Sequence, residues 1–173
     1  MSRHPGKFAG PLSVCVTGWS GAGKTTLIAR AIAECTRRGL VASAVKRARH
    51  SPELFGTGKD TSVFLGAGAR ASVYASDSGS VVFLPPSPEG IPAPYGRILE
   101  AADILFWEGA EVGGALRISV VASGAGLEGL KRPLAATDLL VTDDPVCAAA
   151  ALAAGVPALP PGDAGGFIDF ILE

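Results

Sequence analysis

This 173-residue sequence has few cysteines, few histidines and a net charge close to zero, and each of these features argues against a class of protein. Three cysteines and two histidines, with no Cys-x-x-Cys pair and no His-rich run, argue against a disulfide scaffold and against a metal carrier. A formal net charge of −1 argues against bulk nucleic-acid binding, which needs clustered Lys and Arg. The longest apolar runs are too short for a membrane span. We therefore expect a cytoplasmic protein with no nucleic-acid or membrane partner.

The composition favours an α/β domain. Hydrophobic residues make up 48% of the chain, charged residues 18%, and the mean hydropathy is +0.37. These values are typical of a parallel sheet that is covered on both faces. We predict a flexible leader at residues 1–10, which contain no apolar signal core, and a single domain at residues 11–173. Cys15, Cys35 and Cys147 are expected to be reduced core residues.

The stretch from Gly18 to Thr26 has the residue spacing of a phosphate-binding loop. It follows the apolar run from Leu12 to Thr17 and opens a helical pattern from Lys24 to Arg38, which is the context that the motif requires. Glycines allow backbone N–H groups to converge on an anion, and the helix presents its positive N-terminal end. The predicted nucleotide-binding residues here are Ser20, Gly21, Ala22, Gly23, Lys24, Thr25 and Thr26.

Two loop residues, Lys24 and Thr25, and one distant acid, Glu108, carry the expected chemistry of this site. Lys24 is predicted to reach the terminal phosphates as a point charge, and Thr25 to hold Mg²⁺ through its hydroxyl. Glu108 follows the apolar run from Ile104 to Trp107, where P-loop proteins place an acid that steadies Mg²⁺ through water; a Glu that caps a neighbouring loop is the alternative. Because no general base is evident, we expect slow, electrostatic catalysis by Lys24 and Thr25.

The remaining pattern predicts a mostly parallel sheet with an antiparallel hairpin. Further strands are predicted at residues 40–45, 71–75, 80–84, 117–122, 139–141 and 156–159. The strands at 71–75 and 80–84 flank a turn sequence and predict the hairpin. Helices are predicted at 61–68, 95–102, 145–154 and 163–172, the last two capped by Asp144 and Asp163. Ligands are expected at the carboxyl ends of the parallel strands.

A polar loop follows the second predicted strand and is a candidate switch or lid. Lys46, Arg47, Arg49 and His50 place four cations within five positions, suited to a triphosphate, a phosphorylated substrate or an acidic partner. A solvated basic loop is the alternative. Asp60 suits the N-cap of the next helix, and a role in the water shell of a metal is the other interpretation.

Taken together, these motifs resemble the molybdopterin-guanine dinucleotide biosynthesis protein B family of P-loop GTP-binding proteins. The resemblance covers most of the chain and includes Gly18 to Thr26, Lys46 with His50, Gly58-Lys59-Asp60-Thr61 with Ala67-Gly68-Ala69, and Trp107-Glu108-Gly109 with Val141-Thr142-Asp143. It implies a three-layer α/β P-loop NTPase fold, a homodimer, GTP and Mg²⁺ binding with slow hydrolysis, and assistance to a partner enzyme that joins GMP to molybdopterin. Lys46, Lys59 and Asp60 therefore join the candidate nucleotide-binding residues.

The chain departs from the family pattern in two places. After the second strand the family carries an Asp and several His, whereas this chain has Arg47 to Arg49 beside the single His50. After Glu-Gly the family tends to have an aromatic residue and a Lys, whereas this chain has Ala110 and Glu111. Both changes affect the second substrate or partner surface and leave the phosphate loop intact.

Two other functions remain open from the residues. An ATP-dependent small-molecule kinase would recruit Arg47, Arg49 and Arg70 to its phosphates. A nucleotide-gated binding module would order the loop from Arg47 to Thr61 on triphosphate and dock a partner. The chain lacks the Asn-Lys-x-Asp pairing that gives many GTPases their guanine preference. GTP is therefore expected from the resemblance alone.

Overall fold

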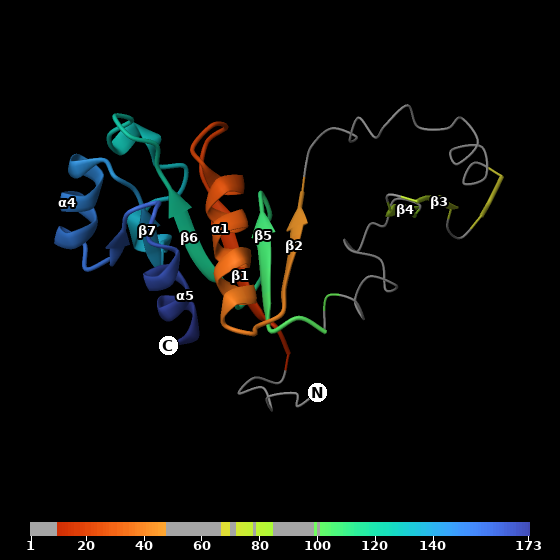
Figure 1. The fold of residues 1–173 in the computed structure, drawn as a ribbon. Helices are drawn as coiled ribbons and strands as arrows, with labels where there is room; N and C mark the ends of the chain where they lie inside the picture. The colour runs from red at the N-terminus through yellow and green to blue at the C-terminus, as the bar shows by residue number, and fades with distance from the viewer. Residues whose placement is uncertain (1–9, 48–66, 70–71, 78, 85–98, 100) are drawn as a thin grey trace. The chain divides into compact units, whose positions relative to one another are not determined.

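The computed structural model describes residues 10–47, 67–69, 72–77, 79–84, 99 and 101–173 (Figure 1). The chain divides into two compact units, one formed by Met1–Arg47 with Leu99–Glu173 and the other by Ala48–Ile98. The helices predicted at 61–68 and 95–102 lie mostly outside the described residues. Arg49, His50, Lys59, Asp60 and Arg70 lie wholly outside them.

The first unit contains a six-stranded sheet in the order β2-β5-β1-β6-β7-β8, in which every pair of neighbours is parallel. Its strands are β1 (Leu12–Thr17), β2 (Ala42–Lys46), β5 (Ile104–Glu108), β6 (Leu116–Val120), β7 (Leu139–Val141) and β8 (Ala158–Leu159). The strand that carries Glu108 is paired on both sides, by β1 and β2. Its predicted central position is confirmed.

Three helices in the described part of the chain pack on the two faces of this sheet (Figure 1): α1 (Lys24–Arg37), α4 (Pro145–Ala153) and α5 (Ala164–Leu172). The helices α1 and α5 pack on one face, over a core that includes Leu139 and Val141. The helix α4 packs on the other face, over a core that includes Leu140. All three residues of β7 are buried, as expected of a parallel strand with helices on both sides. The predicted three-layer α/β fold is confirmed.

Strand and helix ends follow local hydrogen bonds. The strand β2 begins at Ala42 instead of the predicted Leu40, because the Leu40 N–H bonds back to Cys35 at the end of α1 and the Val41 N–H donates to the Asp103 carboxylate. Asp144 and Asp163 accept backbone N–H groups at the starts of α4 and α5, which confirms both predicted N-caps.

The three cysteines are free and buried, as predicted. Within the described residues, no helix combines the length and the apolar character that a membrane span needs.

The second unit contains the predicted hairpin. The strands β3 (Ser72–Ser76) and β4 (Gly79–Phe83) pair in antiparallel fashion, and in the described residues they form a two-stranded sheet. Ser76 and Gly79 are the last paired residues before the turn, so the hairpin lies where the turn sequence places it.

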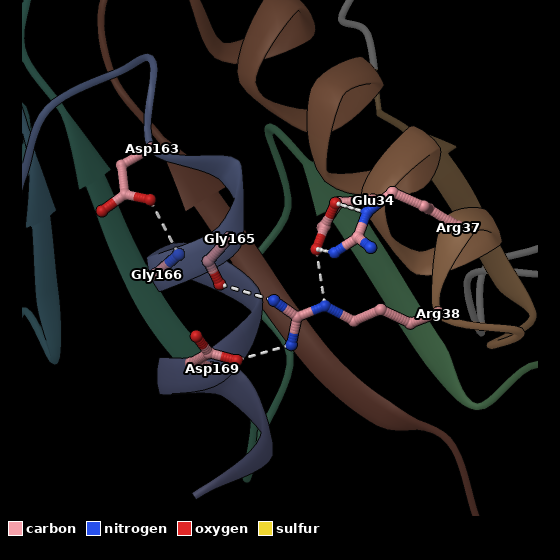
Figure 2. A network of polar contacts seen from close by, with 7 residues as sticks. All are labelled: Glu34, Arg37, Arg38, Asp163, Gly165, Gly166 and Asp169. Atoms are coloured by element: carbon pink, nitrogen blue, oxygen red, sulfur yellow. Dashed lines mark hydrogen bonds and ion pairs between the residues drawn. The ribbon is translucent and has the colours of Figure 1, made fainter.

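A network of charged residues ties the end of α1 to α5 (Figure 2). Glu34 accepts hydrogen bonds from Arg37 and, at 2.6 Å, from Nε of Arg38. Arg38 also donates to the Asp169 carboxylate at 2.5 Å and to the Gly165 carbonyl at 3.1 Å. The hydrogen bonds from Arg37 and Arg38 lower the pKa of Glu34 to about 2. This arrangement fixes the end of α1 that lies opposite the phosphate loop.

The substitution Glu34→Gln is expected to lower the melting temperature of the protein at neutral pH. The folded-state pKa of Glu34 lies below its unfolded value, so its stabilisation is present above the unfolded pKa and is lost as the pH falls toward about 2. The melting temperature of the wild type should therefore fall more steeply between pH 5 and pH 2 than that of the variant. Glu128→Gln is the control, since Glu128 is exposed and has no ion pair among the described residues. Parallel pH profiles for the wild type and the Glu34 variant would contradict the prediction.

Candidate functional site

The loop between β1 and α1 has a shape that depends on its glycines. Gly18 is buried directly after β1, and a Cβ at this position would lie 2.5 Å from the carbonyl oxygen of Val120 in β6. Gly21 and Gly23 have φ angles of 78° and 90°, which favour glycine because other side chains are strained there. The predicted phosphate-binding loop is therefore a tight turn packed against the neighbouring strand.

The start of α1 differs from the starts of α4 and α5. Its N-cap is Gly23, with no side-chain hydrogen bond and no acidic residue in the first turn, whereas Asp144 and Asp163 cap the other two helices. Within the described part of the chain, the first-turn N–H groups of α1 thus have no side-chain acceptor. Such groups form an anion site when they face a cleft.

A cleft of about 300 Å³ lies at this helix start. It is lined by Ser20, Gly21, Gly23, Lys24, Thr25, Thr26, Lys46 and Glu108. The structure thus brings together the predicted residues from the loop, from the end of β2 and from the end of β5. Ala22 packs against the core instead of lining the cleft, and its N–H donates to the Trp19 carbonyl at 3.2 Å.

Glu108 links the phosphate loop to β2. Its Oε2 accepts a hydrogen bond from the Thr25 hydroxyl at 2.9 Å, and its Oε1 lies 3.2 Å from Nζ of Lys46. Both contacts follow from the sheet, because Glu108 pairs with Val16 on one side and with Lys46 on the other. Gly109 continues the chain with a φ of 74°, and a Cβ there would lie 2.9 Å from the Arg47 carbonyl oxygen.

Lys24 lies against the loop itself. Its Nζ donates to the Trp19 carbonyl at 2.7 Å. Partial burial is the main cause that lowers the pKa of Lys24; Glu108 opposes this shift, and the ammonium groups of Lys131 and Lys46 add to it. Lys24 therefore lies within electrostatic range of two further ammonium groups and of one carboxylate.

The oxygen atoms of Thr25 and Glu108 suit a hard divalent cation such as Mg²⁺. A hydroxyl and a carboxylate oxygen already lie 2.9 Å apart at the cleft, and Mg²⁺ prefers oxygen ligands. Among the described residues, no group of three or more His, Cys, Asp or Glu forms a metal cage. This donor set fits an ion that takes its other ligands from phosphate oxygens and water.

Sequence reasoning missed Arg132, which is 8% exposed. Its Nη2 donates to the Thr17 hydroxyl at 3.1 Å and forms an ion pair with Glu111, while its Nη1 has no hydrogen-bond partner among the described residues. The neighbouring Lys131 lies over the Trp19 ring, 5.6 Å from the centroid. These residues come from a loop that has no motif of its own, so no local signal could have identified them.

The sequence of this chain matches one known protein family. The sequence model for molybdopterin guanine dinucleotide synthesis protein B matches residues 13–139. The chain belongs to this family. Membership assigns the chain a nucleotide-binding P-loop fold and a role in molybdenum cofactor biosynthesis. A comparison with curated protein sequences finds no match.

Solved structures agree with the family assignment. A molybdopterin-guanine biosynthesis protein B structure is 28% identical, with 93% of this chain and 97% of that chain covered and a TM-score of 0.62. The Bacillus subtilis MobB structure shares the fold at 20% identity, 94% and 96% coverage and a TM-score of 0.63. Hydrogenase maturation factor HypB from Archaeoglobus fulgidus also shares the fold, at 16% identity, 94% and 89% coverage and a TM-score of 0.55.

The structure explains one departure from the MobB family pattern. Glu111, which stands where a Lys is expected, forms its ion pair with the buried Arg132. Glu111 thus pairs with the same guanidinium that donates to Thr17, the residue just before the phosphate loop. Ala110, the other departure, is buried.

Gly18→Ala should destabilise the protein by about 1–3 kcal/mol, because overpacking against a backbone carbonyl forces the loop or the strand to shift. The matched control is Gly113→Ala, where a Cβ would meet nothing within 4 Å and the expected change is within about 0.5 kcal/mol. Urea unfolding of the two variants measures the difference. Equal stability of both variants would show that Gly18 is not held against Val120.

Proposed function

We propose that this MobB family member binds GTP with Mg²⁺, hydrolyses it slowly, and assists a partner enzyme that attaches GMP to molybdopterin. The observation that carries the proposal is the hydrogen bond from Thr25 to Glu108 across the cleft. It joins a phosphate loop to a strand-end acid, which is the pair of groups that a magnesium nucleotide requires. Ser20 to Thr26, with Lys46, are the described residues to which we assign nucleotide binding.

The phosphates would lie at the start of α1. Backbone N–H groups of the loop and of the first helical turn supply hydrogen bonds, and Lys24 supplies charge. When nucleotide enters, the Lys24 ammonium is already held next to the loop by the Trp19 carbonyl. The positive side chain is therefore positioned before the ligand arrives, which limits the entropy lost on binding.

Mg²⁺ would be held by the Thr25 hydroxyl and, through water, by Glu108. When bound, the ion would offset the negative charge that develops between the terminal phosphates. Nζ of Lys46 lies 3.2 Å from Oε1 of Glu108 and offsets the carboxylate charge beside the metal position.

Turnover would be slow because the cleft offers little acid–base chemistry. Glu108 is the carboxylate among the described lining residues, and both of its oxygens are engaged by Thr25 and Lys46. A general base needs a free basic atom within hydrogen-bond reach of the attacking water. Rate enhancement would come from electrostatic stabilisation by Lys24, Thr25 and the loop amides.

Family membership supports the remaining parts of the proposal. The preference for GTP, the GMP-transferring partner, the homodimer and the cytoplasmic location are carried over from the resemblance, as are the roles of Lys59 and Asp60. A single nucleotide-binding domain at residues 11–173, preceded by a flexible leader, also remains a prediction.

Lys24→Ala should weaken GTP binding by about 10- to 100-fold, the usual effect of losing charge-assisted contacts to an anion. Isothermal titration calorimetry with GTP and ATP, with and without Mg²⁺, measures the change. Arg37→Ala is the matched control, because it removes a positive charge that is exposed at the opposite end of α1. Wild-type affinity in the Lys24 variant would rule out the phosphate site.

The same titrations distinguish the competing functions. Selective GTP binding with turnover far below about 1 s⁻¹ supports the accessory GTPase. A preference for ATP, with turnover that rises when small metabolites are added, would support a kinase instead.

Glu108→Gln should reduce the Mg²⁺ dependence of GTP binding while leaving Mg²⁺-free binding close to wild type, since the amide keeps the shape and loses the charge. A Mg²⁺ titration at fixed GTP concentration provides the measurement. Glu128→Gln, on an exposed turn, should titrate like the wild type. If the Glu108 variant does so too, Glu108 has no role in the metal site.

A further inference from the structure

Trp19 contacts two lysine side chains, one through its backbone carbonyl and one through its ring. Its carbonyl oxygen accepts a hydrogen bond from Nζ of Lys24 at 2.7 Å, and its indole ring lies beneath Nζ of Lys131, 5.6 Å from the centroid. The residue as a whole is 55% exposed. Trp19 therefore brings the ammonium group of a distant loop to the same short turn that holds the phosphate-loop lysine.

The backbone that carries Lys131 is anchored beside this turn. Arg132 is buried, donates to the Thr17 hydroxyl at 3.1 Å and forms an ion pair with Glu111. Thr17 is the last residue of β1 and is followed directly by Gly18, where the phosphate loop begins. Arg132 thus fixes its neighbour next to the loop, so that less conformational freedom is lost when Lys131 binds a ligand.

The charges around Lys24 are unbalanced. Lys46 and Lys131 each lie close enough to Lys24 for electrostatic repulsion, and Glu108 is the carboxylate that attracts it. Three ammonium groups against one carboxylate leave an excess of two positive charges. Glu108 is already paired with Lys46, and Lys131 forms no ion pair with any described residue. Unpaired like charges repel one another, and a polyanion in the cleft would relieve that repulsion.

We propose that Lys131 is an additional phosphate-binding residue, which moves its ammonium group from the Trp19 ring onto the terminal phosphates of the bound nucleotide. The inference rests on the proposed nucleotide-binding function. The Trp19 ring holds the cation near the site by a cation–π contact, and this contact is weak enough to be exchanged for a charged phosphate oxygen. Lys131 would therefore favour triphosphate over diphosphate, because the terminal phosphate adds charge.

Calorimetric titration of the full chain with Mg·GTP and Mg·GDP at two salt concentrations tests this role. Lys131→Ala should weaken GTP binding by about fivefold or more, weaken GDP binding less, and reduce the salt dependence of GTP binding. Lys131→Arg keeps the charge and should retain most of the affinity. Arg37→Ala, which removes a charge at the other end of α1, should bind both nucleotides as the wild type does.

Trp19 provides a second readout. Trp19→Phe keeps an aromatic ring beneath Lys131, whereas Trp19→Ala removes it, so the alanine variant should lose more GTP affinity than the phenylalanine variant. Circular dichroism melting confirms that each variant is folded before titration.

The outcomes separate this inference from the proposed function. If the wild type binds GTP, Lys24→Ala weakens that binding as expected and Lys131→Ala leaves GTP and GDP affinities unchanged, then the role of Lys131 is overturned and the nucleotide site stands. Equal losses for GTP and GDP would overturn the contact with the terminal phosphate. If the wild type binds no nucleotide, both proposals fail.

Discussion

The parallel pairing of β5 between β1 and β2 is the constraint on which the site depends. It places Glu108 beside Val16 on one strand and Lys46 on the other. The acid is therefore held between the start of the phosphate loop and a compensating ammonium group, within hydrogen-bond reach of Thr25. A shift of one residue in this register would turn the carboxylate to the opposite face of the sheet, away from α1.

The helix α1 connects this chemistry to the rest of the fold. Its first turn faces the cleft and its buried side packs on the sheet, while Arg38 at its far end binds Glu34 and Asp169. Both ends of the helix are therefore fixed by contacts from other parts of the chain. A phosphate site of backbone N–H groups requires such rigidity, because small displacements weaken several hydrogen bonds at once.

Family membership and the individual residues of this chain explain different things. The MobB family assignment accounts for the phosphate loop and the role in molybdenum cofactor biosynthesis. The end of β1 before the loop is contacted by residues outside that motif: Arg132 donates to Thr17 and pairs with Glu111. The buried guanidinium needs a carboxylate partner, since an unpaired buried charge is costly. Glu111, which departs from the family pattern, is thus the partner of Arg132 in an ion pair.

Local sequence patterns determined the phosphate loop, the apolar strands and the N-caps Asp144 and Asp163, because each depends on residues a few positions apart. They also identified Glu108 as a strand-end acid, since a buried strand followed by a carboxylate is a local feature. Tertiary structure alone decided that β5 separates β1 from β2, and that Arg132 reaches Thr17 across 115 positions of chain. It also decided where Lys131 lies. Such contacts form between segments far apart in sequence, and their partners are chosen by packing and charge burial, which leave no periodic signal in the chain.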